Sequence, residues 1–161
     1  IAQTDAKRQP QVHYDDRLLL SALISKRPVP IEMAENVPNG AAYDYDRRTV
    51  VVQRGMDGQD LFRCVSLAMA RAELDQTEHA DPQADAFRGY CVSYMLCRKY
   101  GVDARGYDFS RLPESLRDAD SQTIRSELTD IRDTLQTMTG RMERALERSR
   151  AAAQKNGRKE R

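Results

Sequence analysis

Residues 60–75, DLFRCVSLAMARAELD, decide the fold that the sequence predicts. Apolar side chains recur in this stretch every three or four residues, which places them on one face of a helix. The residues on that face are Leu61, Phe62, Val65, Ala68, Met69 and Ala72. Because such a broad apolar face has to be covered, we expect this helix to lie in the core of a domain.

The segments around this helix predict an α+β fold. Residues 41–45, AAYDY, and 49–53, TVVVQ, are strand candidates on either side of a turn, which is the pattern of a β-hairpin. Residues 83–101, QADAFRGYCVSYMLCRKYG, predict a second buried helix that ends at Gly101. Residues 14–27 predict an N-terminal helix that stops before Pro28. The expected domain therefore has an N-terminal helix, a short hairpin or three-stranded sheet, and two buried helices.

A long helix is expected at the C-terminal end, over residues 118–155. Its apolar residues follow one another in steps of three or four, close to a heptad. They are Ile124, Leu128, Ile131, Leu135, Met138, Met142 and Leu146. A helix of about 35 residues is roughly 50 Å long, more than a small domain covers. The pattern therefore predicts self-association or a protein partner through this helix.

The second half of that helix is basic. Arg141, Arg144, Arg148 and Lys155 are candidate contacts for nucleic acid or for a partner, because clustered cations can neutralise phosphates. No aromatic residues lie between them, so such a contact would be nonspecific. The predicted organisation is a linker or disordered start over 1–13, a domain over 14–117, the helix over 118–155 and a basic disordered tail over 156–161.

Composition limits the protein class. A chain of 161 residues suits one domain, and a formal net charge of +1 creates no chain-wide field toward nucleic acid or membrane. No apolar run approaches a membrane span and no signal peptide is visible, which predicts a cytoplasmic protein without a membrane partner. The chain begins with Ile1, so we expect a piece of a longer protein.

The three cysteines, Cys64, Cys91 and Cys97, form no CxxC pair. Their odd number argues against a disulfide framework, and the missing pair argues against a zinc knuckle. All three lie in apolar helical patterns. We therefore expect buried free thiols in a reducing compartment.

Together, the hairpin, the helix after it and residues 94–103, YMLCRKYGVD, resemble a known family. With the Tyr107-Asp108-Phe109 segment that follows, they are similar to ImmA/IrrE-like metallopeptidase domains, especially the ArdC-type branch of antirestriction and mobile-element proteins. The similarity covers about residues 40–110 and implies a zincin-like domain. In that family a His-Glu-x-x-His helix supplies two zinc ligands and the base that activates water, and the second helix supplies an acidic third ligand.

The resemblance places those functions on residues that cannot perform them. Val65 and Met69 stand at the two histidine positions, and Ser66 stands at that of the glutamate. The third ligand falls on Arg88 or, in another register, on Gln83. Valine offers no donor atom, a thioether is a poor zinc ligand and a guanidinium repels the cation. This implies a degenerate site with no catalytic residue, metal or cofactor. A competing interpretation is that Val65 and Met69 are ordinary core residues without metal ancestry.

Other candidate sites are weaker. His79 lies in a loop among acidic residues whose spacing matches no known metal loop, so a solvated acidic loop is the preferred interpretation. These acidic residues are Glu73, Asp75, Glu78, Asp81 and Asp85. His13, the other histidine, is expected to be exposed in the linker. Tyr90 and Tyr94 could form a pocket or could simply supply aromatic core.

Three functions remain open at this point. The first is a non-catalytic interaction domain of a larger mobile-element or phage-like protein, based on the missing ligands and the long helix. The second is a zinc-dependent peptidase whose metal site is not recognised from the sequence. The third is a nonspecific nucleic-acid-binding accessory module, based on the basic C-terminal end.

Overall fold

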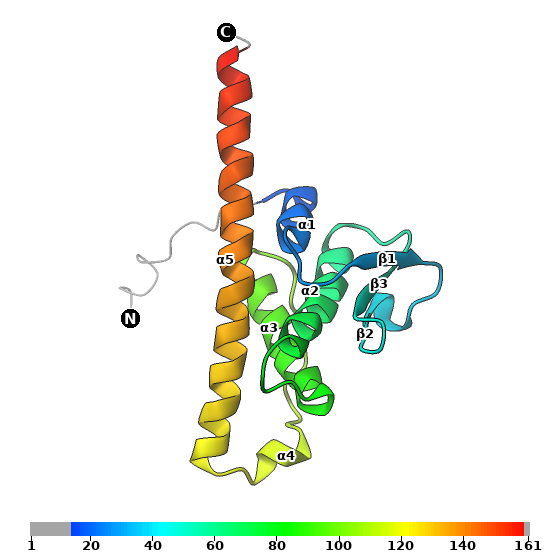
Figure 1. Ribbon diagram of the computed structural model, residues 1–161, viewed down its shortest axis with the longest axis vertical. Coiled ribbons are helices and arrows are strands. Elements are labelled where there is room, and N and C mark those ends of the chain that lie inside the picture. The colour runs from blue at the N-terminus through cyan, green and yellow to red at the C-terminus, as the bar shows by residue number, and fades with distance from the viewer. Residues whose placement is uncertain (1–13, 160–161) are drawn as a thin grey trace.

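The computed structural model describes residues 14–159 and has the predicted α+β fold (Figure 1). In chain order the elements are α1 (Asp16–Ile24), β1 (Ile31–Ala34), the 3₁₀ turn η1 (Pro38–Gly40), β2 (Ala41–Asp44), β3 (Thr49–Gln53), α2 (Gly58–Asp75), α3 (Pro82–Lys99), α4 (Glu114–Arg117) and α5 (Ser121–Lys159). The predictions for the linker over 1–13, for His13 and for residues 160–161 lie outside the described residues.

The sheet has three strands in the order β1-β3-β2. The predicted hairpin is confirmed, because β2 pairs antiparallel with β3 and Tyr43 lies opposite Val50. The third strand, β1, pairs parallel with β3 on the other side and places Ile31 opposite the same valine. The central position of β3 explains its run of β-branched residues, of which Val50 and Val52 are buried.

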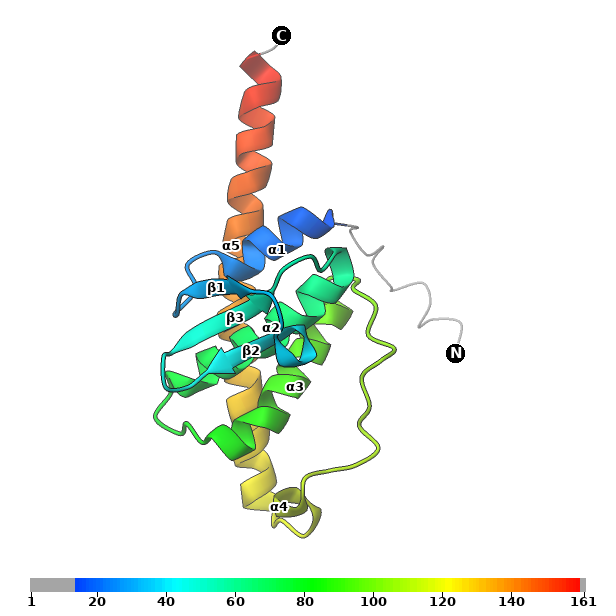
Figure 2. The same ribbon diagram turned by 90° about the vertical axis from the view of Figure 1, so that its right-hand side faces the viewer.

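Helix α2 lies in the middle of the molecule, between the sheet and α3 (Figures 1 and 2). Gly89 allows α3 to approach it closely, because a Cβ at that position would lie 2.9 Å from Cγ of Arg71. At its start, α3 is capped by Asp81, whose carboxylate accepts the backbone N–H of Gln83 at 3.2 Å. It ends before Gly101, whose φ of 73° provides the predicted stop.

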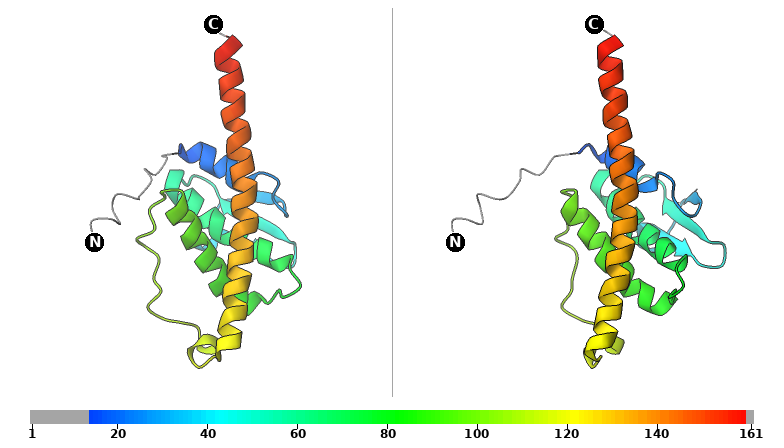
Figure 3. Two further views of the ribbon diagram at one scale, coloured as in Figure 1. Left: turned by 90° about the vertical axis from the view of Figure 1, so that its left-hand side faces the viewer. Right: turned by 60° about the vertical axis from the view of Figure 1, so that its left-hand side comes forward.

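Helix α5 lies along α1 and α3 and then continues beyond the rest of the fold (Figures 1 and 3). Its apolar seam is buried only in its middle part, at Ile131, Met138, Met142 and Leu146. Ile124 and Leu128, at its start, are exposed. The residues that predicted self-association are thus largely covered by the chain's own helices. The helix begins at Ser121, three residues later than predicted, and residues 156–159, predicted to be disordered, are helical.

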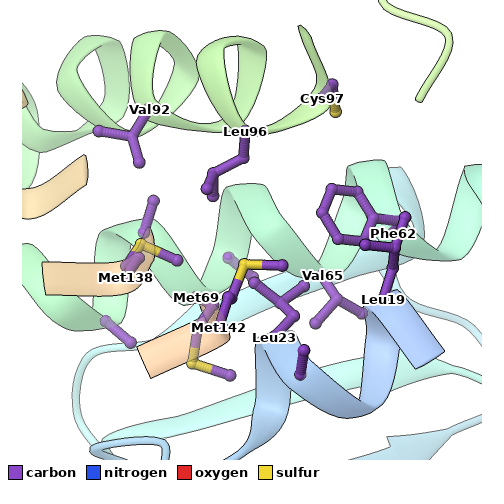
Figure 4. Close-up of a cluster of buried hydrophobic side chains, with 14 of the residues drawn as sticks. Leu19, Leu23, Phe62, Val65, Met69, Val92, Leu96, Cys97, Met138 and Met142 are labelled. Carbon is purple, nitrogen blue, oxygen red and sulfur yellow. The ribbon is translucent and has the colours of Figure 1, made fainter. Parts of the chain in front are cut away.

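One apolar core joins α1, α2, α3, β3 and α5 (Figure 4). Val92 and Leu96 of α3 and Leu19 and Leu23 of α1 all belong to this core. Among residues 14–159, no helix combines the length and the apolar composition that crossing a membrane requires.

Candidate functional site

The two positions at which the resemblance places zinc-binding histidines lie in the apolar core. Val65 is 2% exposed and Met69 is 0% exposed. Figure 4 shows both of them among Leu23 of α1 and Met138 and Met142 of α5. This part of α2 therefore presents hydrocarbon and thioether groups to an apolar interior, and neither group is a strong ligand for zinc.

Ser66, where the resemblance places the catalytic base, belongs to a chain of hydrogen-bonded hydroxyl groups. Its Oγ donates to the carbonyl oxygen of Arg63 at 3.0 Å and lies 2.6 Å from Oγ of Ser93 on α3. Ser93 in turn lies 2.6 Å from the hydroxyl of Tyr107, which is 3.6 Å from Sγ of Cys97. Burial raises the pKa of Tyr107, so its hydroxyl stays protonated. The chain ties α2, α3 and the following loop together.

Four aromatic side chains hold that loop against α3. The rings of Tyr90 and Tyr94 lie 5.0–5.6 Å from those of Tyr107 and Phe109. The hydroxyl of Tyr90 also accepts the backbone N–H of Asp108 at 2.6 Å. Tyr90 and Tyr94 line different hollows, of about 220 and 510 Å³, and Tyr107 lines both. The tyrosines proposed as a pocket therefore hold the chain's own loop.

Replacing Tyr107 by phenylalanine is expected to lower the free energy of unfolding by about 1 kcal/mol, because the buried Ser93 hydroxyl loses a partner. Urea unfolding measures this change. The matched control is Tyr94→Phe, since the Tyr94 hydroxyl makes no hydrogen bond to the described residues and the ring stays in place. Equal losses in the two variants would contradict a role for the hydroxyl chain.

Arg88, where the resemblance places the third ligand, is the centre of an ion-pair cluster that joins α3 to α5. Its Nε donates to Glu127 at 2.8 Å, and a second nitrogen contacts the other oxygen of the same carboxylate. Its remaining nitrogen donates to Asp85 at 3.1 Å and to the carbonyl oxygen of His79 at 3.3 Å. A carboxylate oxygen of Asp130 lies 3.5 Å from the second of these nitrogens, Nη2 of Arg88. The guanidinium is thus engaged by carboxylates, not by the face of Val65 and Met69.

Gln83, where the other register of the resemblance places the third ligand, is exposed at the start of α3. Gln83 and Arg88 line a hollow of about 500 Å³ between α3, α4 and the start of α5. Glu114 and Glu127 also line it, so its charged groups are mostly acidic. Neither register brings the third-ligand position to the buried face of α2.

The acidic loop is only partly the solvated loop that the sequence predicts. Asp85 is 0% exposed and accepts the backbone N–H of Asp81 at 3.2 Å as well as Arg88. Burial raises the pKa of Asp85, while these two hydrogen bonds lower it. The prediction is therefore wrong for Asp85, whose carboxylate is a buried structural group that pairs with a cation.

Two further acidic residues of that region are also engaged. Asp75 accepts the hydroxyl of Tyr43 at 2.6 Å, and Glu73 lies 2.9 Å from Arg141 of α5. The His79 ring is exposed, with Nδ1 3.5 Å from Asp130. Within residues 14–159, no three side chains of the metal-binding types are grouped so that they could hold an ion.

The predicted cationic contacts divide into two kinds. Arg141 is paired with Glu73, and both side chains are nearly buried, which leaves Arg141 little surface for a partner. Arg144, Arg148 and Lys155 are exposed. Arg148 donates to Oγ of Ser25 at 3.2 Å, which places the end of α1 beside α5.

That contact adds two cations that the sequence reasoning missed. Lys26 and Arg27 directly follow Ser25 and are exposed. They are separated from Arg148 by about 120 residues, so only the packing of α1 on α5 brings this part of the chain near Arg148. No periodicity in the sequence connects them.

Comparison of the chain with protein-family models, with characterised proteins and with solved structures gives no match. The resemblance to ImmA/IrrE-like metallopeptidases therefore stays a prediction from the sequence.

Proposed function

We propose that this chain is a non-catalytic interaction domain. In this view a metallopeptidase-like core has lost its metal site and serves as the base for a projecting helix. The observation that carries the proposal is the complete burial of Val65 and Met69 in the apolar core. The setting implied by the resemblance, a larger mobile-element or phage-like protein, belongs to the same proposal.

The chemistry of the positions supports a loss of catalysis. Metal-assisted hydrolysis needs an ion with an open coordination position and a base that can reach the bound water. Here the residue at the position of the base, Ser66, is 0% exposed and is hydrogen-bonded to Arg63 and Ser93. An attacking water would have to enter a core that side chains of α1 and α5 close (Figure 4).

The geometry of α5 supports a role in interaction. Leu146 is its last buried residue, and residues 147–157 are all exposed. These residues extend over about 16 Å of helix, which has no cover from the domain (Figure 1). A polar helix that is anchored at one end and free at the other suits contact with a partner.

The test of the proposal is metal content. After incubation with zinc and dialysis, elemental analysis of the purified protein is expected to find far less than one zinc per chain. A chelator is expected to leave the midpoint of thermal unfolding unchanged, because a structural or catalytic metal would stabilise the fold that binds it.

Near-stoichiometric zinc would instead favour the second function, a peptidase with an unrecognised site. The variant His79→Ala, on the exposed loop, then serves as the first localisation, with Cys64→Ala on α2 as the comparison. Zinc that survives dialysis and is lost in either variant would overturn the proposal.

A further inference from the structure

We propose that one flank of α5, together with the end of α1, binds the phosphate backbone of nucleic acid without regard to sequence. The inference rests on the proposed function, because it assigns the partner of the projecting helix. We call this surface the basic flank. It consists of Lys26, Arg27, Arg144, Arg148 and Lys155.

Helical spacing aligns the three cations of α5. Arg144, Arg148 and Lys155 are separated by four and seven residues, so they fall within roughly 40° around the helix axis and extend over about 16 Å. All three are exposed. Between residues 144 and 157 the only acidic residue is Glu147, so the stripe keeps a net positive charge.

The end of α1 widens the stripe into a surface. Arg148 reaches Oγ of Ser25, and Arg27 donates to the carbonyl oxygen of Ile24 at the last turn of the same helix. Figures 1 and 2 show α1 beside α5 where the latter leaves the fold. The basic flank therefore draws its five exposed cations from two segments of the chain that meet at Ser25 and Arg148.

The composition of the free helix favours nucleic acid over a protein partner. Residues 147–157, ERSRAAAQKNG, contain no apolar side chain larger than alanine. The buried centre of a stable protein interface is apolar, and aromatic or large apolar residues fill it. Phosphate contacts need only cations at the right spacing, and the release of counterions provides the driving force. With no aromatic residue to stack on bases, the contact is to the backbone.

The test is binding of a fluorescent random-sequence DNA duplex, followed by anisotropy between about 50 and 200 mM salt. We expect the logarithm of the association constant to fall linearly with the logarithm of the salt concentration. The variant R144Q/R148Q/K155Q is expected to reduce the magnitude of that slope by about 0.9 for each cation that contacted a phosphate. The variant K26N/R27Q is expected to reduce it as well.

The matched control is R125Q/R132Q/R150Q, which removes the same charge from exposed positions of the same helix. These three arginines lie roughly 120° around the axis from the basic flank. The control is expected to keep most of the salt slope. Because all substituted side chains are exposed, circular dichroism is expected to show the same helix content in every variant.

Three results would overturn the inference: no binding of the duplex at the lowest salt, equal weakening in the control and the flank variant, or tighter binding of polyglutamate than of DNA. The last would point to an acidic protein partner. None of them bears on metal content, so the proposed loss of catalysis stands or fails separately. Likewise, zinc in the purified protein would not bear on the proposal that the basic flank binds nucleic acid.

Discussion

Replacing Arg88 by alanine is expected to lower the free energy of unfolding by about 3–5 kcal/mol. Arg88 is 7% exposed and pairs with Asp85, which is 0% exposed. Truncation of the arginine removes the cation and leaves a buried carboxylate without a counter-charge. It also releases Glu127, the carboxylate through which α5 is held at this end of α3. Chemical denaturation of the two proteins measures the difference.

A double variant separates two contributions to this loss of stability: the loss of the ion pair, and the cost of leaving the Asp85 carboxylate buried without a counter-charge. In Arg88→Ala/Asp85→Asn the buried carboxylate becomes neutral, so the double variant is expected to be more stable than Arg88→Ala alone. Arg132→Ala is the surface control. Its pair with Asp133 has side chains that are 65% and 60% exposed, so we expect a loss within about 0.5 kcal/mol.

The pH dependence gives an independent signature. Burial raises the pKa of Asp85, and loss of the Arg88 guanidinium raises it further. A raised pKa in the folded state means that stability is greatest where the carboxyl is protonated and falls as pH rises through that pKa. The deficit of Arg88→Ala relative to the wild type is therefore expected to shrink in acid and to be complete at neutral pH. A deficit that does not change with pH would contradict the stranded-carboxylate explanation.

Periodicity in the sequence was sufficient to predict most helices and strands, but it did not predict all the elements that pair with one another. The apolar spacing of α2 and the Val50–Val52 run are strong signals, because each follows the period of its own structure. Strand β1 gives no such signal. Its four residues, Ile31–Ala34, are half-buried or exposed, so they show no alternation. Their place in the sheet depends on pairing with β3, which is a tertiary property.

The polar contacts were missed for a similar reason. Arg88 and Glu127 are 39 residues apart. The sequence alone assigned Arg88 to a former metal-ligand position and gave it no partner. One signal could have pointed to them. Asp85 and Arg88 are spaced i, i+3 in the first half of a largely apolar helix, where buried charged residues are retained only if they are paired. The residues of α5 that complete the cluster could not be identified without the packing of the two helices.

Replacing Met142 by alanine is expected to lower the free energy of unfolding by about 2–5 kcal/mol. Met142 is 1% exposed and belongs to the core that includes Val65 and Met69. Its truncation removes dispersion contacts and leaves a cavity that α1 and α2 fill only partly. The size of the loss in unfolding free energy tests whether α5 is part of the domain core or only contacts the surface of the domain.

Met95→Ala is the matched control, because this methionine of α3 is 41% exposed and loses far fewer contacts. Removal of residues 150–161, beyond the buried seam, is expected to change the unfolding free energy by less than about 0.5 kcal/mol. If instead Met142→Ala were harmless while the shortened chain lost stability, the roles of the two halves of α5 would be reversed. An unfolding midpoint that rises with protein concentration would mean that a second copy supplies part of the cover. The expected midpoint is independent of concentration, because the chain's own α1, α2 and α3 already bury the seam from Ile131 to Leu146.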